Sequence, residues 1–181
     1  MHPIARLRRA LAPSVVALGL VPMLAGCALT DGLDAGRPAP ELAVDTWVLA
    51  PGGRAHDLAA LRGRHVLLEF WSLACPHCRD EVPEIQRLHE TYGPRGLVVV
   101  TVHVPLGNAR VSPADVARYA KEAGITFAIG FDADGDTTVD YDYGYLPHAV
   151  LVTPDGRVAW SGSLSFFDVE DRVRAAVGAT R

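Results

Sequence analysis

Two cysteines three residues apart, Cys75 and Cys78, are the residues of this 181-residue chain whose type and spacing most directly suggest chemistry. A C-x-x-C pair can be redox-active, can form half of a metal site, or can be two unrelated core thiols. Here the pair follows an apolar run and begins an amphipathic segment, so we expect it between a buried strand and a helix. The N-terminal partial charge of that helix would stabilise the Cys75 thiolate, and Cys78 could then resolve a mixed disulfide.

A metal site is the less favoured interpretation of the same pair. A structural zinc ion needs four ligands, and the sequence contains no second C-x-x-C and no C-x-x-H motif. The third cysteine, Cys27, lies far upstream in an apolar leader. We therefore interpret Cys75 and Cys78 as a redox-active pair, and we predict no metal and no bound cofactor.

The elements that position the pair can be predicted from apolar patterning. Residues 66–71 and 97–102 are nearly continuous apolar runs, as expected of strands buried on both faces of a parallel sheet. Between them, residues 75–92 place their apolar side chains on one helical face, which completes a βαβ unit. The remaining predicted elements are a helix capped by Ser112 and ending at Gly124, a strand over 125–129, a hairpin of 148–153 and 157–161, and a last helix from the cap Asp168 to Gly178.

The residues around the cysteines resemble the thioredoxin superfamily, and within it the TlpA/ResA-like reductases of the AhpC/TSA or redoxin type. The run from Leu67 to Pro83 follows the strand, active site and kinked helix of that group in register, and Pro147 matches the cis-proline of the superfamily. The resemblance implies an α/β thioredoxin fold, with a central mixed sheet flanked by helices and an inserted helix and strand. It also implies a protein thiol-disulfide oxidoreductase, in which Pro147 shapes the surface that docks the substrate.

Two carboxylates are candidates for moving protons. Glu69 interrupts an apolar strand, where a carboxyl group is costly unless it has a partner or a use. Thioredoxins have a buried Asp at the matching position that handles the proton of the second cysteine, which implies that Glu69 accepts the proton of Cys78. Glu81 lies one turn after Cys78, where the ResA-like group has a functional Glu. The alternatives are a strand-end carboxylate that reaches water for Glu69 and an exposed first-turn acid for Glu81.

The dipeptide between the cysteines leaves the direction of exchange open. Pro76 and His77 resemble the dipeptide of the disulfide-oxidase DsbA family, and His77 would favour the Cys75 thiolate and make the couple more oxidising. About 40 residues separate Thr101 from Leu146, too few for the helical domain that DsbA proteins insert at this point. We predict a reductase of extracytoplasmic protein disulfides, with a DsbA-like disulfide donor as the alternative.

Other functions on the same fold are less favoured. A peroxiredoxin needs P-x-x-x-[TS]-x-x-C, and although Ser72 is in place, Leu68 occupies the proline position. A Sco-like copper chaperone would add His148 or His103 to the two thiolates, but Sco proteins have C-x-x-x-C spacing. An acidic run starting at Asp132 mimics the beginning of a calcium loop, but it lacks the required Gly and Glu, so we predict a solvated loop.

The N-terminus has the layout of a secretory signal. Three arginines precede an uncharged apolar run over residues 10–25, which is shorter than the roughly 20 residues that a membrane-spanning helix needs. The run ends in Leu-Ala-Gly-Cys, which resembles the lipobox of bacterial lipoproteins and implies that Cys27 is lipidated. We predict a signal peptide over 1–26, a solvated tether rich in Gly and Pro over 27–40, and one thioredoxin-like domain over 41–181.

The net charge of −4 and the lack of a Lys/Arg cluster outside the leader argue against nucleic acid as a partner. Removal of the leader, which holds three Arg and no acidic residue, makes the remaining chain more acidic still. By analogy with cytochrome c biogenesis systems, we expect two kinds of protein partner. These are an extracytoplasmic substrate with thiols or disulfides and a membrane protein that donates or accepts electrons. We expect the chain itself to be anchored in the bacterial cell envelope through Cys27, on the periplasmic side in a Gram-negative organism.

Overall fold

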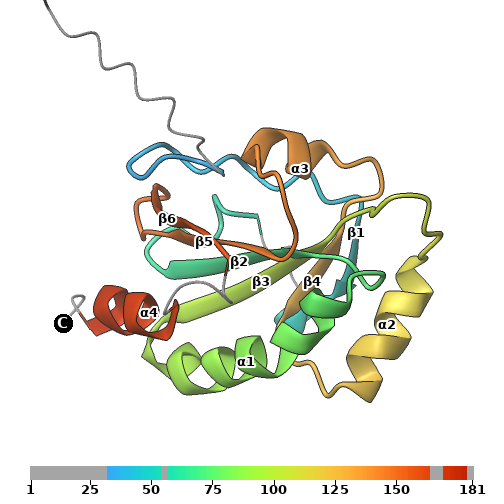
Figure 1. The fold of residues 1–181 in the computed structure, drawn as a ribbon. Helices are drawn as coiled ribbons and strands as arrows, with labels where there is room; N and C mark the ends of the chain where they lie inside the picture. Colours follow the sequence, from blue (N-terminus) through green and yellow to red (C-terminus); the bar gives the residue numbers. More distant parts are fainter. Residues whose placement is uncertain (1–31, 54–56, 164–168, 179–181) are drawn as a thin grey trace, which may run out of the picture.

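The computed structural model describes residues 32–53, 57–163 and 169–178. Its centre is one six-stranded mixed sheet with the strand order β1-β4-β3-β2-β5-β6 (Figure 1). Strands β2, β3 and β4 are parallel to one another, β1 pairs antiparallel with β4, and β5 pairs antiparallel with both β2 and β6. The strands are β1 (Thr46–Leu49), β2 (His65–Trp71), β3 (Leu97–His103), β4 (Ala128–Phe131), β5 (His148–Val152) and β6 (Val158–Gly162).

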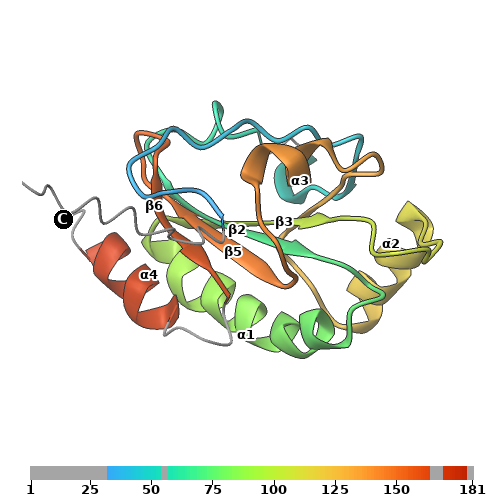
Figure 2. The same ribbon diagram turned by 45° about the horizontal axis from the view of Figure 1, so that its top comes forward.

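Helices cover both faces of the sheet. On one face lie α1 (Pro76–Tyr92), α2 (Pro113–Glu122) and α4 (Val169–Gly178), and on the other lie the short α3 (Asp136–Tyr141) and the N-terminal segment (Figures 1 and 2). Because successive side chains of a strand point to opposite faces, Leu67 and Trp71 pack in the core under α1, whereas Leu68 and Phe70 pack in the core under α3. Two buried cores, one on each face, therefore hold β2 in place.

The predicted βαβ unit around the cysteines is confirmed, and so is the fold class. The second helix also begins as predicted: the hydroxyl of Ser112 accepts a hydrogen bond from the backbone N–H of Asp115, and the Asp115 carboxylate accepts one from the N–H of Ser112. The predicted strand over 125–129 is displaced, because the chain pairs with β3 only from Ala128. Gly130 lies inside β4, and a Cβ atom at this position would collide with the side chain of Val44.

In the acidic run near Asp132, Asp134 and Asp136 are exposed, as predicted for a solvated loop, but Asp132 is not. Asp132 is 1% exposed, and its carboxylate accepts hydrogen bonds from the backbone N–H groups of Gly135, Asp136 and Thr137 at 2.9 to 3.1 Å. Gly135 is the N-cap of α3 and the other two residues begin the helix, so the Asp132 carboxylate binds N–H groups at the start of a helix that apolar periodicity did not indicate.

The prediction of a solvated tether is wrong for its described part, residues 32–40. The N–H of Gly36 donates to Val158 at 2.7 Å, the N–H of Val158 donates to Arg37 at 2.8 Å, and Leu33 and Ala39 are buried in the core under α3. Backbone pairing with β6 and burial of apolar side chains both begin ahead of residue 41, so the described residues from Gly32 on belong to the domain.

Several predictions lie outside the described residues, among them the signal peptide, Cys27 and the cap Asp168. In the ranges that are described, no helix combines the length and the apolar character needed to cross a membrane.

Candidate active site

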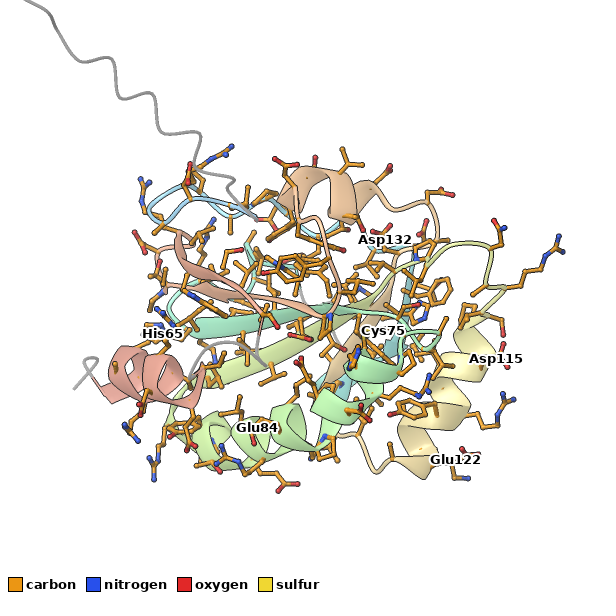
Figure 3. All side chains as sticks on the ribbon, viewed as in Figure 1. His65, Cys75, Glu84, Asp115, Glu122 and Asp132 are labelled. Carbon is orange, nitrogen blue, oxygen red and sulfur yellow. A yellow bond between two sulfur atoms is a disulfide. The ribbon has the colours of Figure 1, made fainter. Side chains whose placement is uncertain are left out.

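Cys75 and Cys78 lie where β2 passes into α1, at the carboxyl-terminal end of the parallel strands. In Figure 3 this end carries the label Cys75, and His65, the first residue of β2, lies at the opposite end. The two cysteines form a disulfide, with their Cα atoms 5.3 Å apart. Cys75 is the N-cap of α1, and its sulfur accepts a hydrogen bond from the backbone N–H of Cys78 at 3.2 Å. The helix terminus therefore stabilises negative charge on this sulfur, as the sequence predicted.

The loop before Cys75 is held in a fixed shape. The N–H of Cys75 donates to the carbonyl of Ser72 at 3.0 Å, and the guanidinium of Arg79 donates to the carbonyl of Leu73 at 2.6 Å. Pro76 occupies the first turn of α1, where its missing N–H has no cost. Arg79 was not singled out from the sequence. Its position one helical turn after Cys75 was the signal that could have identified it.

Glu69 and Glu81 are both buried, so the exposed alternatives for them are wrong. Glu69 is 0% exposed and pairs in the sheet with Thr101 and Ala149, while Glu81 is 8% exposed on α1. Burial raises the pKa of Glu69 well above its ordinary value, and the nearby Glu81 carboxyl raises it further through charge repulsion. Among the described residues, neither Glu69 carboxyl oxygen has a hydrogen-bond partner.

The other predicted site residues are placed as follows. The Leu146–Pro147 peptide bond is cis, as the resemblance implied, and it directly precedes β5. Pro83 lies inside α1. His77 is exposed in the first turn of that helix, one residue before Cys78. These positions make Pro147 and His77 available to the roles predicted for them, and the roles themselves remain predictions; Pro83 marks the fold and was given no chemical role.

The two histidines considered as copper ligands do not lie together. His148 is fully buried on the α3 face, where its Nε2 lies 2.7 Å from the Ser161 hydroxyl and its ring stacks on Tyr143. It faces away from the cysteines, and a site built from two thiolates and His148 is not assembled. His103 lies on the α1 face with its ring stacked on Phe131, and burial lowers its pKa to about 4.

The fold and the cysteine pair define a thioredoxin-like protein with a dithiol-disulfide site. The chain belongs to the AhpC/TSA family, whose model matches residues 35–161. That match includes β1 to β5, β6 up to Ser161, the cysteine pair and part of the segment that the sequence had assigned to a tether.

Named relatives agree with this class. The chain is 27% identical over 144 residues to the thiol-disulfide oxidoreductase ResA of Bacillus subtilis (strain 168), covering 80% of this chain and 75% of that protein. It is 33% identical over 121 residues to the protein DipZ of Mycobacterium tuberculosis (strain CDC 1551 / Oshkosh), covering 66% of this chain and 17% of DipZ. The chain therefore corresponds to about one sixth of the length of DipZ.

Solved structures agree on the fold. A crystal structure from Chlorobium tepidum, of a protein proposed to be the thiol:disulfide interchange protein DsbE, has a TM-score of 0.68 to this chain at 24% identity. It covers 80% of this chain and 99% of its own. The thioredoxin-like fold and the family predicted from the sequence are thus confirmed.

Proposed function

We propose that this chain is a thiol-disulfide oxidoreductase that reduces disulfides of extracytoplasmic proteins through Cys75 and Cys78. The observation that carries the proposal is the disulfide itself, placed at the N-terminus of α1 with two buried carboxyl groups nearby. The names of the ResA relatives support the enzyme class that the sequence predicted.

The exchange begins at Cys75 in the reduced protein. Its thiolate attacks one sulfur of the substrate disulfide, forms a mixed disulfide, and releases the other substrate sulfur as a thiolate that takes up a proton. The Cys78 thiolate then attacks the Cys75 sulfur, which re-forms the internal disulfide and releases the second substrate thiol. Two electrons pass from the cysteine pair to the substrate, and the partner that reduces the pair again restores them.

Glu69 removes the proton from Cys78 before the second step. Its raised pKa brings its protonation equilibrium closer to neutral pH than that of an ordinary Glu, which is what a general base working on a thiol requires. Glu81, which is slightly exposed and close enough to raise the pKa of Glu69 through its charge, passes the proton on toward solvent. The pair thus serves as one acid-base unit rather than as two independent carboxylates.

His77 influences the reduction potential of the cysteine pair, and so the direction of the exchange. An exposed imidazole next to Cys78, in the turn that caps the Cys75 sulfur, favours the thiolate when it is protonated. A strong effect would make the couple oxidising and the protein a donor of disulfides. We place the chain on the reductase side because its sequence resembles TlpA/ResA-like proteins over the whole site and DsbA only at the dipeptide.

The cellular setting follows from the leader. We propose that residues 1–26 are removed, that Cys27 carries the lipid, and that the domain faces the extracytoplasmic side of the cell envelope, next to a membrane protein that exchanges electrons with it. Because residues 32–40 pack on the sheet, only residues 28–31 would separate the lipidated cysteine from the described domain.

Reduction of insulin by the full chain, with dithiothreitol as the electron source, tests the activity. Cys75→Ser should abolish the reduction, because the attacking thiolate is lost and the remaining Cys78, only 1% exposed, cannot reach the substrate disulfide. Cys78→Ser should stop turnover but allow attack, so a mixed disulfide with insulin should accumulate and should dissolve on adding excess dithiothreitol. A Cys75→Ser protein that works at the wild-type rate would overturn the proposed function.

A further inference from the structure

The N-terminal segment fixes the point at which the chain joins the domain. Residues 32–40 run along β6 on the α3 side of the sheet, opposite α1 and α4 (Figures 1 and 2). Gly32 is packed directly against β5 and β6, because a Cβ atom there would collide with the Ser161 hydroxyl and with Nε2 of His148. The first described residue is therefore held in place on the α3 side of the domain.

This position limits which face of the domain can lie against a membrane. Under the proposed function a lipid is attached to Cys27, five residues before Gly32. An extended chain covers at most about 3.6 Å per residue, so about 18 Å can separate the two residues. The layer that holds Gly32 and the helix layer beyond the sheet are each about 10 Å thick. The outer surface of α1, α2 and α4 is thus too far from Gly32 to rest on the lipid.

Exposed arginines gather at one end of the accessible face. Because Val152 pairs with Val66, the turn between β5 and β6 lies beside the beginning of β2. The N–H of Gly63 donates to the carbonyl of Pro154 in this turn at 2.9 Å, and Nη1 of Arg157 donates to the carbonyl of Gly36 at 2.8 Å. We call this region the arginine end, and its exposed arginines are Arg37, Arg62, Arg64 and Arg157.

The arginine end is within reach of the lipid-bearing residue. Gly32 lies level with Ser161, which is four residues from Arg157 along the strand, or about 13 Å. An extended connection of about 18 Å covers that distance. The arginine end can therefore touch the lipid surface while the N-terminal segment stays packed on β6.

Acidic charge is distributed unevenly between the two ends of this face. At the arginine end, the Asp155 carboxylate lies 3.4 Å from Nε of Arg157, and the carboxylates of Glu41 and Asp57 accept backbone N–H groups of residues 58–60. Residues 132–142, which follow β4 at the active-site end, contain five Asp, four of them exposed, and no Lys or Arg. An anionic surface therefore repels the active-site end and favours the arginine end.

We infer that the arginine end of the domain rests on an anionic lipid surface and holds the cysteine pair on the side away from the bilayer. This inference rests on the proposed lipidation of Cys27. Arginine side chains are attracted to anionic headgroups within a Debye length of the surface, about 8 to 10 Å at moderate salt. Because the lipid anchor already keeps the domain at the membrane, a weak attraction is enough to orient it.

The orientation sets the height at which the cysteines react. β2 contains seven residues and rises about 3.3 Å per residue, so Cys75 lies about 20 Å farther from the lipid than the arginine end. Figure 3 shows His65 and Cys75 at opposite ends of this strand. A membrane protein that exchanges electrons with the pair must therefore present its own thiols well above the bilayer surface, and not at the level of the headgroups.

The test maps which arginines a lipid surface covers. The mature, lipid-bearing chain is reconstituted in vesicles of phosphatidylcholine, alone or mixed with phosphatidylglycerol, and modification of each arginine by phenylglyoxal is followed by mass spectrometry. On the anionic vesicles, Arg37, Arg62 and Arg157 should react roughly tenfold more slowly than on the neutral ones, and about 1 M salt should abolish the difference. Arg110 in the loop after β3 and Arg118 on α2, both exposed, are the controls and should react equally on both.

Charge variants separate the effect of the arginines from that of the anchor. Arg37→Gln combined with Arg62→Gln keeps the lipid but removes two charges, so Arg157 should lose most of its protection on anionic vesicles. Arg110→Gln combined with Arg118→Gln removes two charges elsewhere and should leave the protection of Arg157 unchanged.

Each result decides between the proposals. Equal rates at the arginine end on both kinds of vesicle would overturn the inference and leave the lipid anchor and the redox function standing. Slower modification of Arg110 instead would also overturn it, because the active-site end would then face the lipid. A mature chain that does not float with the vesicles would overturn the proposed lipid anchor, and the inference with it.

Discussion

The carboxyl groups of Glu69 on β2 and Glu81 on α1 are neighbours inside the protein, and the charge of the Glu81 carboxylate raises the pKa of Glu69. Two carboxylates this close cannot both be ionised without strong repulsion, and the burial of Glu69 makes its charged form the costlier one. The pair therefore holds a proton at a pH where an exposed Glu has lost it. The Glu69 and Glu81 carboxyl pair lies on the same face of the sheet as Cys78.

Replacement of Glu69 by Gln should slow insulin reduction by about 100-fold near neutral pH, the low end of what general-base catalysis contributes. The wild-type rate should rise with pH as Glu69 ionises, and this rise should be missing in Glu69→Gln. Initial rates between pH 5 and 9 measure both effects. Glu84→Gln, on the exposed side of α1, is the control and should keep the wild-type profile. A Glu69→Gln profile identical to wild type would remove Glu69 from the mechanism.

The same carboxyl should make folding stability depend on pH. Because the pKa of Glu69 is higher in the folded protein than in the unfolded chain, the folded state holds the extra proton, and stability is greatest below the unfolded value. Stability is then lost as pH rises toward the folded pKa. The oxidised wild type should therefore lose more stability than Glu69→Gln between pH 5 and 8, since Gln stays neutral.

Denaturant unfolding of both oxidised proteins at the two pH values measures this difference. Glu84→Gln again serves as the control, because its carboxylate is exposed. Parallel losses in wild type and Glu69→Gln would show that Glu69 does not bind its proton more tightly in the folded state.

The N-terminal segment should contribute to stability, in contrast to a free tether. Leu33 is 6% exposed in the core under α3, so Leu33→Ala should reduce the free energy of unfolding by about 2 to 4 kcal/mol. Urea unfolding of the full chain measures it. Val139→Ala, at a position 76% exposed, should change stability by less than about 0.5 kcal/mol. A Leu33→Ala protein as stable as this control would contradict the packing of the segment.

The parts of the fold that could be predicted from the sequence are those with strong local patterns. β2 and β3 are nearly continuous apolar runs, α1 has its apolar side chains on one helical face, and α2 begins with a capping box. β1 and α3 were missed because both are short: β1 depends on its pairing with the distant β4, and α3 has about one and a half turns whose first N–H groups are bound by the nearby Asp132 carboxylate. Leu33 was missed for a similar reason, since one apolar residue among Gly and Pro has no local period.

The site shows the same division. The cysteines, their place at a helix N-terminus and the two carboxyl groups could be identified from spacing and resemblance. The proximity of the Glu69 and Glu81 carboxyl groups could not, because it brings together a strand and a helix across the core. The proximity of Ser72 to His103 could not be predicted from the sequence either. The two residues were considered separately, Ser72 for peroxide chemistry and His103 for copper, and only the sheet brings them together.

The reduction potential of the Cys75/Cys78 pair tests the central claim most directly. The full chain is equilibrated in graded dithiothreitol and glutathione buffers, and the free thiols are trapped and counted, with Cys75→Ser as the control that lacks the couple. The account predicts a single two-electron transition near the thioredoxin value of about −270 mV. A transition near the DsbA value of about −120 mV would contradict the reductase direction, and the absence of any transition would contradict a redox role for the pair.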